Sequence, residues 1–324
     1  MAKLRKPLCT GVLLGTVVVA LLFTLGGCGR EGETRVVDFS KTVAVSVPDT
    51  SARGPDDLKV AVASMVSPKE SFVYYRELLD YLSKRLDRKV ELVQRKTYRE
   101  VNDLLKRGLI DLAFICSGPY AASRGEDGFE LLAAPEISGS HFYQSYLIVN
   151  KSSPYQDLSD LQGKTFAFTD QESNTGRLVP LYWLALMGER PETFFTKSVF
   201  TYSHDNSIMA TAKGLVDGAA VDGLIWEYFN QTKPDVTSKT RVIRKSEPYG
   251  MPPVVASSSL SRQMKDRVRH VLLTAHDDSE GRKILDGLKI DRFIEPRDDW
   301  YDSIREMIKS MQGQPGERNE RAEP

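Results

Sequence analysis

The sequence predicts an α/β protein of two lobes, each a parallel sheet of the Rossmann type with helical crossovers. Short apolar runs alternate with segments of helical periodicity, which is the pattern of strand–helix–strand units. Once a leader is set aside, about 300 residues remain, which is more than one hydrophobic core usually organises. GLIDLAF at 108–114 and GLVDGAA at 214–220 occupy equivalent places, so the two lobes are expected to share one topology.

The first set of elements opens with a strand and a helix whose apolar residues recur at helical spacing as far as Leu86. Thr97 and Glu100 fit the capping box, so a second helix should start at Thr97 and stop near Gly108. The expected strands of this set are 59–65, 89–93 and 109–115.

The second set repeats this order after residue 160. Its first helix is expected to run from about residue 176 to 187, and its second from about 206 to 213. The expected strands are 164–168, 197–203 and 215–221.

Two stretches, 143–149 (YQSYLIV) and 249–255 (YGMPPVV), are expected to join the halves as hinge crossings. Helices at about 258–277, 279–288 and 298–311 should then pack back on the first lobe. The predicted bounds are 58–145 with 252–311 for lobe 1, 146–251 for lobe 2, and 312–324 for a disordered tail. Parallel sheets of this kind bind ligands beyond the carboxyl ends of their strands, so a cleft between the lobes is the expected site.

The N-terminus indicates export from the cytoplasm. Basic residues precede an apolar run from about Leu8 to Leu25, as in the secretory signal peptide predicted for residues 1–27. Leu25-Gly26-Gly27-Cys28 is also a lipobox, which predicts a lipid on Cys28 and a tether over residues 28–57. An uncleaved membrane anchor is the alternative, although the run is shorter than the ~20 residues that span a bilayer. Within the tether, 36–47 could form an isolated strand.

Composition and cysteine count exclude several classes. Lys and Arg number 44 and Asp and Glu number 44, so no net field favours nucleic acid as a partner. With Cys9 in the leader and Cys28 lipidated, Cys116 has no intramolecular partner for a disulfide. The four histidines lack metal-ligand spacing, and we expect neither metal nor cofactor.

The stretch ESNTGRLVPLYW at 172–183 is the strongest candidate for a binding site. Pro180 is tolerated only in a first helical turn, which places the helix start near Gly176. The N–H groups of 176–178 are then expected to face the cleft, beside the hydroxyls of Ser173 and Thr175, and to bind an anion. The alternative is that Ser173 or Thr175 merely caps the helix.

His204 and Asp222 follow strands of the same expected sheet, so both should border the cleft. A capping role for Asp205 or Asn206 is the alternative use of the polar residues around His204. Trp226 and Tyr228 come close behind Asp222 and could line the cleft or belong to the core.

Four segments of the sequence resemble, in order, the signature segments of the phosphonate-, phosphite- and phosphate-binding proteins of ABC importers. The resemblance covers roughly residues 59–290 and implies the type II periplasmic-binding-protein fold. The segments are DLAFICSGPY (111–120), DLSDLQGKTFAFTDQESNTGRLVP (157–180), FTYSHDNSIMATAKGLVDGAAVD (200–222) and YGMPPVV (249–255).

This resemblance implies a set of ligand-binding positions in both lobes. Asn174 stands where the family usually has a hydroxyl residue, and the carboxylate of Asp222 would favour an oxyanion that keeps a P–OH group. The implied ligand-binding residues are Tyr98, Ser117, Tyr120, Ser173, Asn174, Thr175, Gly176, His204 and Asp222.

The function expected is capture of a small phosphorus oxyanion by a monomeric, lipid-tethered binding protein that delivers it to an ABC permease. A sensing module that closes on the same ligand and docks on a receptor or histidine kinase is the alternative. Cys116 and His204 also supply the side-chain types of a nucleophile and a base, but no orienting third group accompanies them, so no enzyme is predicted.

Overall fold

The computed structural model describes residues 57–65, 68–123 and 129–312. These residues all belong to one unit of the chain, Arg53–Pro324. The signal peptide, the lipid site at Cys28, the strand at 36–47 and the tail beyond residue 312 lie outside the described residues. Within the part of the chain that is described, every helix is too short or too polar to cross a membrane.

The first sheet has six strands in the order β13-β4-β12-β3-β1-β2. Strand β1 runs parallel to β2 and β3, whereas β12 runs antiparallel to β3 and β4. The strands are β1 Leu58–Val62, β2 Val90–Val93, β3 Leu112–Phe114, β4 Phe129–Glu136, β12 Val254–Ser257 and β13 Arg292–Ile294.

The second sheet has five strands in the order β10-β6-β9-β7-β8. Strand β7 runs parallel to β8 and β9, whereas β6 runs antiparallel to β9 and β10. The strands are β6 Ser145–Asn150, β7 Thr165–Phe168, β8 Lys197–Phe200, β9 Gly218–Asp222 and β10 Thr240–Lys245. We call the six-stranded sheet with its helices lobe 1 and the five-stranded sheet with its helices lobe 2, while the lobe bounds given above stay predictions.

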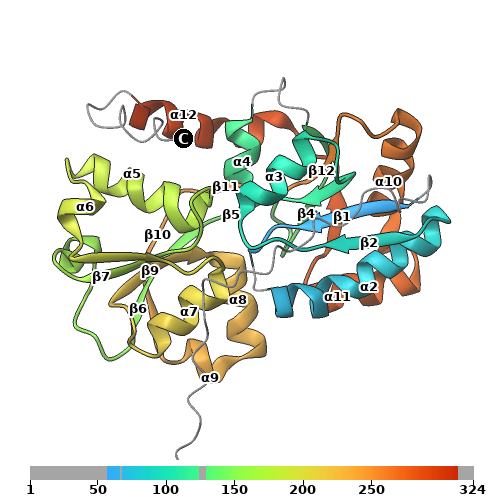
Figure 1. The fold of residues 1–324 in the computed structure, drawn as a ribbon. Helices are drawn as coiled ribbons and strands as arrows, with labels where there is room; N and C mark the ends of the chain where they lie inside the picture. The colour runs from blue at the N-terminus through green and yellow to red at the C-terminus, as the bar shows by residue number, and fades with distance from the viewer. Residues whose placement is uncertain (1–56, 66–67, 124–128, 313–324) are drawn as a thin grey trace, which may run out of the picture. The chain divides into compact units, whose positions relative to one another are not determined.

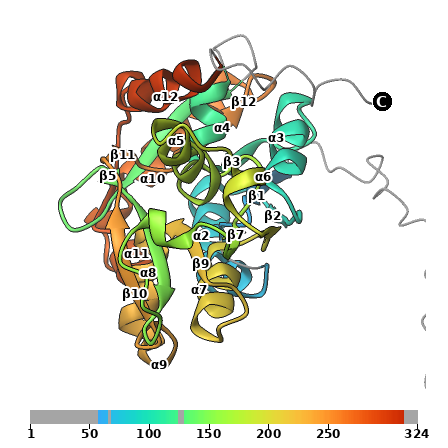
Figure 2. The same cartoon turned by 90° about the vertical axis from the view of Figure 1, so that its left-hand side faces the viewer.

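Both sheets are mixed, which corrects the expectation of purely parallel lobes. The parallel strands end at the cleft, so a strand that enters from the other lobe starts there and must run the opposite way. Strands β6 and β12 are these entering strands. Two short strands, β5 (Phe142–Tyr143) and β11 (Tyr249–Gly250), pair beside them with Tyr143 opposite Tyr249, which confirms the two hinge crossings (Figures 1 and 2).

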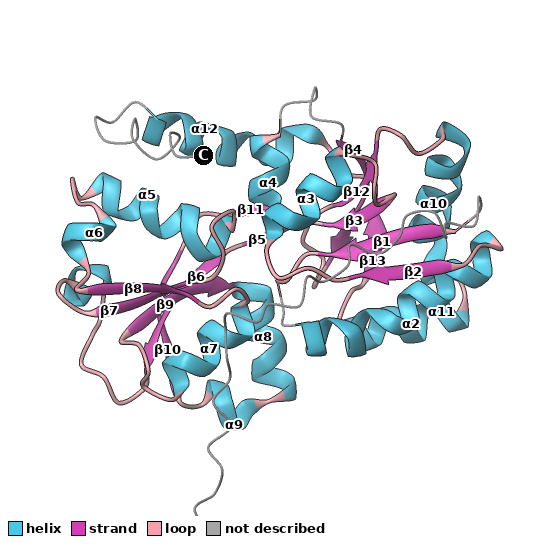
Figure 3. Cartoon of the chain, viewed as in Figure 1, coloured by secondary structure: helices cyan, strands magenta, loops and turns pink. Residues whose placement is uncertain are grey.

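Helices cover both faces of each sheet (Figure 3). Lobe 1 carries α2 Pro68–Leu86, α3 Tyr98–Lys106, α4 Ser117–Ala122, α10 Arg262–Thr274, η5 Ala275–Asp277, α11 Ser279–Leu288, η6 Asp298–Tyr301 and α12 Asp302–Gln312. Lobe 2 carries η3 Leu158–Leu161, η4 Asn174–Leu178, α5 Val179–Leu186, α6 Pro191–Phe194, α7 His204–Ala212, α8 Gly223–Thr232 and α9 Pro234–Thr237.

Local sequence signals account for several helix starts. The Thr97 side chain accepts the N–H of Glu100 and the Glu100 side chain accepts the N–H of Thr97, which confirms the capping box of α3. Helix α7 begins at His204, two residues earlier than expected, so Asp205 and Asn206 lie inside its first turn and do not cap it. Helices α10 and α11 pack against α2, as expected, while α12 contacts α4 and also α5 of lobe 2.

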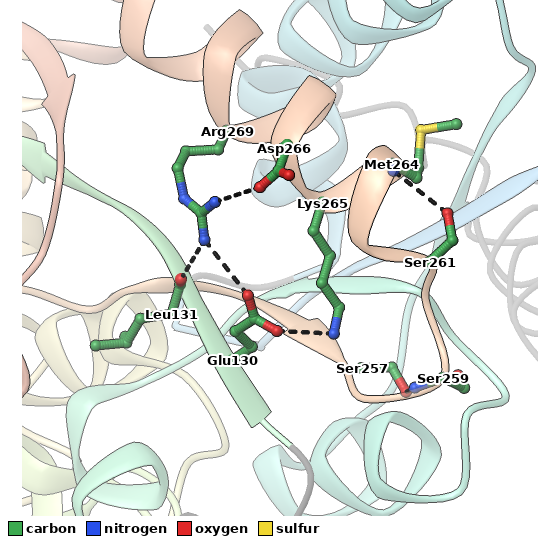
Figure 4. A network of polar contacts seen from close by, with 9 residues as sticks. All are labelled: Glu130, Leu131, Ser257, Ser259, Ser261, Met264, Lys265, Asp266 and Arg269. Atoms are coloured by element: carbon green, nitrogen blue, oxygen red, sulfur yellow. Dashed lines mark hydrogen bonds and ion pairs between the residues drawn. The ribbon is translucent and has the colours of Figure 1, made fainter.

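An ion-pair network fixes α10 on β4 in lobe 1 (Figure 4). Lys265 Nζ lies 2.8 Å from Glu130 Oε2, and Arg269 donates to Glu130 and to the carbonyl of Leu131. Lys265 is buried with this carboxylate beside it. The network therefore supplies the charge partner that a buried ammonium requires.

Candidate functional site

The loop after β7 folds back on itself before the helix begins. The N–H of Thr169 donates to the carbonyl of Gly176 at 3.1 Å, and the N–H of Gly176 donates to Ser173 Oγ at 2.9 Å. The N–H of Leu178 donates to the carbonyl of Ser173 at 3.0 Å, across the wide π turn η4. The expectation of unpaired N–H groups at Gly176 and Leu178 was therefore wrong, because Ser173 caps this turn.

Gly176 is required by the packing of this loop. A Cβ at this position would lie 2.5 Å from the Cβ of Thr169 and 2.9 Å from Ser173 Oγ. Real Cβ atoms essentially never approach so closely, and the Cβ of Thr169 cannot rotate away. Because glycine has no side chain, the backbone at Gly176 can approach Thr169 closely enough for the backbone hydrogen bond between these two residues.

Lobe 1 covers the same loop from the other side. The N–H of Asn174 lies 3.5 Å from Cys116 Sγ, and its side-chain amide donates to Tyr143 Oη at 3.2 Å. Ser117 Oγ lies 2.6 Å from Tyr143 Oη. The structure thus brings two predicted residues, Asn174 and Ser117, onto one tyrosine of the hinge strand that the sequence did not single out.

Four buried polar atoms of residues in or next to the interlobe contacts have no hydrogen-bond partner among the described residues: Asn102 Oδ1, Asn174 Oδ1, Thr175 Oγ1 and Ser203 Oγ. Asn174 and Thr175 are fully buried, and the Ser203 side chain is nearly so. A buried polar group left unpaired costs about 1–3 kcal/mol, so such groups rarely gather without a use. Hydroxyl and amide groups of this kind suit a small polar guest bound between the lobes.

His204 is held in one neutral tautomer. Its Nδ1 accepts the backbone N–H of Asp222 at 3.0 Å, and that group can only donate, so the proton lies on Nε2. Burial lowers the pKa of His204 to about 3, which keeps the ring uncharged. Nε2 faces Tyr98 Oη at 3.5 Å. The imidazole therefore orients the hydroxyl of Tyr98, a fully buried side chain of lobe 1.

Asp222 lies at the end of β9, where it caps α8 by accepting the N–H of Leu224 at 2.8 Å. Burial raises the pKa of this carboxyl to about 7, and hydrogen bonds from the backbone offset only part of that shift. Burial and then the charge of Asp222 raise the pKa of Tyr75 to about 12, and both residues line the same cavity. The carboxyl of Asp222 is accordingly only partly ionised near neutral pH.

Interlobe hydrogen bonds close the cleft on the side of α3. The N–H of Tyr98 donates to Asp170 Oδ2 at 3.2 Å, and the N–H of His204 donates to the carbonyl of Met65 at 2.9 Å. Glu172 pairs with Arg99 at 3.1 Å and accepts from Asn102 Nδ2 at 2.7 Å. Sequence reasoning missed these contacts, since nothing local marks Glu172 as the partner of a helix 70 residues earlier.

Tyr120 is the predicted residue that is not brought to this junction. Its hydroxyl donates to Asp298 Oδ1 at 2.6 Å, and its ring packs edge-on against Tyr301 with centroids 4.6 Å apart. Both partners belong to lobe 1. Its role as a ligand-binding residue stays a prediction without support from its contacts.

The thiol of Cys116 is buried, and burial raises its pKa to about 11. A thiol with this pKa supplies almost no thiolate at neutral pH, so it is a poor nucleophile. Within the described residues, no group of three His, Cys, Asp or Glu side chains is arranged to hold a metal ion.

Two mixed α/β lobes that meet at a hinge ribbon, with polar groups buried between them, define a substrate-binding protein of the type II periplasmic fold. Residues 60–301 match the family model described as ABC transporter, phosphonate, periplasmic substrate-binding protein. The chain belongs to this family, and the resemblance noted in the sequence is confirmed.

Individual relatives agree with this assignment. The phosphonates-binding periplasmic protein of Escherichia coli K12 is 26% identical over 265 residues, which cover 79% of this chain and 78% of the relative. A binding protein component of an ABC phosphonate transporter from Pseudomonas aeruginosa superposes with a TM-score of 0.75, at 24% identity, covering 79% of this chain and 87% of its own. The structure of PhnD1 from Prochlorococcus marinus in complex with methylphosphonate superposes with a TM-score of 0.72, at 23% identity, and the match covers 80% of this chain and 99% of that one. These two structures establish the fold.

Proposed function

We propose that this protein binds a small phosphorus oxyanion, a phosphonate, phosphite or phosphate, between its lobes for uptake by an ABC permease. The observation that supports this most is the unpaired hydroxyl of Thr175 and amide oxygen of Asn174, both fully buried at the interlobe junction. The family to which the chain belongs, and the ligand named for the PhnD1 structure, point to the same chemistry.

The groups around the junction suit an anion that carries a proton. Thr175 and Tyr98 offer neutral hydroxyl donors, and the neutral ring of His204 orients one of them. The carboxyl of Asp222, whose burial brings its pKa to about 7, either accepts a P–OH proton or donates its own. Because the second pKa of a phosphomonoester is about 6, one proton shared between Asp222 and the ligand avoids two facing charges.

Hinge closure supplies the selectivity and the signal to the permease. The ligand replaces its hydration shell with groups from both lobes, and it therefore favours the closed arrangement. The contacts of Glu172 with Arg99 and Asn102 join the two lobes and stabilise that arrangement. A permease that recognises the closed form then receives only loaded protein.

A thermal-shift titration tests the proposal with phosphate, phosphite, methylphosphonate, aminoethylphosphonate and sulfate. A ligand present at 100 times its Kd stabilises the protein by about 2.7 kcal/mol. Thr175→Val keeps the side-chain shape but removes the hydroxyl, so affinity should fall about tenfold to a hundredfold, the effect of one hydrogen bond to a charged group.

The matched control is Thr193→Val on the surface, which should bind like the parent. Equal shifts for Thr175→Val and the control would move the site elsewhere, and no shift with any phosphorus compound would refute the function.

We further propose that the mature chain is a monomer anchored by lipid on Cys28 outside the cytoplasm, after removal of residues 1–27. The lipobox Leu25–Cys28 supports this. In a bacterial host, the parent should incorporate radiolabelled palmitate and sediment with membranes, whereas Cys28→Ser should do neither. Labelling of the Cys28→Ser variant at the parental level would contradict the anchor.

A further inference from the structure

A cavity of about 600 Å³ lies between lobe 1 and helix α8. Asp222 lines it, so it adjoins the interlobe junction described above. The wall from lobe 1 includes Val62, Phe114 and Phe293, and the wall from α8 includes Leu224. Its volume falls within the ~300–1,000 Å³ typical of sites for organic molecules.

The cavity is present although the two lobes are already in contact, so it does not arise from a wide separation of the lobes. The lobes are already in contact beside it, through the hydrogen bond from the His204 N–H to the Met65 carbonyl and through the pairing of Glu172 with Asn102. Met65 also lines the cavity, so the closed contacts and the cavity share a wall. The space therefore persists while the polar junction is closed.

The lining is mostly apolar, with charge near solvent. Phe293 and Phe114 are buried, whereas Asp286 and Asp291 are exposed and Glu227 is half-buried. These three carboxylates form the rim of the cavity, and Lys289 supplies the one ammonium group among the lining residues. An inorganic oxyanion is too small to cover the apolar wall, which would stay hydrated. A second acidic group on the ligand would be repelled by the carboxylates of the rim.

We propose that the ligand is an organophosphorus compound, a phosphonate or phosphate monoester, whose extended organic group fills this cavity and ends in a cationic or uncharged group. This inference rests on the proposed function, since the phosphorus oxyanion must occupy the junction beside Asp222. Apolar side chains of β1, β3 and α8 hold the stem, and the acidic rim excludes a terminal carboxylate.

Calorimetric titration with a matched series tests the size of the organic group. Hexylphosphonate and 6-aminohexylphosphonate should bind more tightly than methylphosphonate, by up to about fourfold for each buried methylene. A hexyl chain ending in carboxylate should bind less tightly than the amine by about tenfold. Asp286→Asn should reduce the difference in affinity between the carboxylate-terminated and the amine-terminated compound, and it should leave the affinity for hexylphosphonate unchanged.

Filling the cavity gives an independent readout. Leu288→Trp and Gln231→Trp enlarge side chains on opposite walls, away from the oxyanion junction. Each should weaken hexylphosphonate at least tenfold while methylphosphonate binds as before, which also shows that the variant is folded. Leu186→Trp, at an exposed leucine outside the cavity, is the control.

Methylphosphonate binding as tightly as hexylphosphonate, or equal loss of both in the two tryptophan variants, would overturn the inference and leave the proposed function intact. Failure of every phosphorus compound to bind would instead refute the proposed function and the inference with it.

Discussion

Replacing Asp222 with asparagine should stabilise the ligand-free protein, and more so as the pH rises. Asparagine retains an oxygen that can accept the N–H of Leu224, so the cap of α8 survives. The substitution removes a buried carboxyl that is only 3% exposed. Burial and backbone hydrogen bonds, and no cationic side chain, set the pKa of this carboxyl. The substitution therefore tests the burial of charge and little else.

The magnitude follows from the pKa. Burial raises the pKa of Asp222 from 3.8 to about 7, so the folded state holds its proton after the unfolded chain has lost it. Stability falls as pH rises between these two values, and the whole cost is present above the higher one. At 1.36 kcal/mol per pKa unit, the cost is about 4 kcal/mol at pH 8 and about 2 kcal/mol at pH 5.

Urea denaturation of the parent and of Asp222→Asn at both pH values measures this difference. The advantage of the variant should grow by about 2–3 kcal/mol from pH 5 to pH 8. Other groups that titrate in this range, including His204 in the unfolded chain, contribute to both proteins and cancel. An advantage that is equal at both pH values would show that Asp222 is not buried as a charge.

Three further substitutions test the loop, the interlobe contacts and the ion-pair network. Gly176→Ala should cost about 1–3 kcal/mol in urea denaturation, because its Cβ would overlap Thr169, whereas a tolerated alanine would contradict this packing. Glu172→Gln should weaken ligand binding by a few-fold at low salt and less at high salt, since the pair with Arg99 is exposed. Glu130→Gln should cost about 1 kcal/mol at pH 7, because Lys265 lowers the pKa of Glu130. This stabilisation is lost as the pH falls through the lowered pKa, so a cost that does not decrease on acidification would refute the reasoning.

Most elements of the fold could be predicted because their signals are local. The capping box at Thr97, the alternation of apolar runs and the two hinge stretches all depend on neighbours in sequence. Strand direction could not be predicted in this way. Whether β6 and β12 run parallel or antiparallel to their neighbours depends on the side of the sheet at which the chain arrives, which is a property of the whole fold.

The start of α7 shows how a backbone conformation can hide from sequence. Tyr202 adopts a positive φ of 63°, and β8 ends at Phe200. A positive φ is uncommon for a residue with a large side chain, so the presence of tyrosine at this position did not indicate that the strand ends there. The strand was therefore expected to continue to residue 203 and the helix to start late.

The residues gathered at the interlobe junction, the candidate site, could be predicted better in lobe 2 than in lobe 1. Residues 173–176, His204 and Asp222 are marked by their place after strands, and the structure puts them at the junction. In lobe 1, Tyr120 was a predicted ligand-binding residue, but its hydroxyl donates a hydrogen bond to Asp298. Tyr143, which was not predicted, instead hydrogen-bonds with Ser117 and Asn174. Those contacts join segments far apart in the chain, so no local pattern reports them.

A crystal structure grown with methylphosphonate tests the central claim most directly. The phosphorus oxyanion should lie between the lobes, with one oxygen within hydrogen-bond distance of Thr175 Oγ1 and another facing the carboxyl of Asp222. Density for the ligand outside this junction, or a junction that closes with Thr175 still unpaired, would contradict the account.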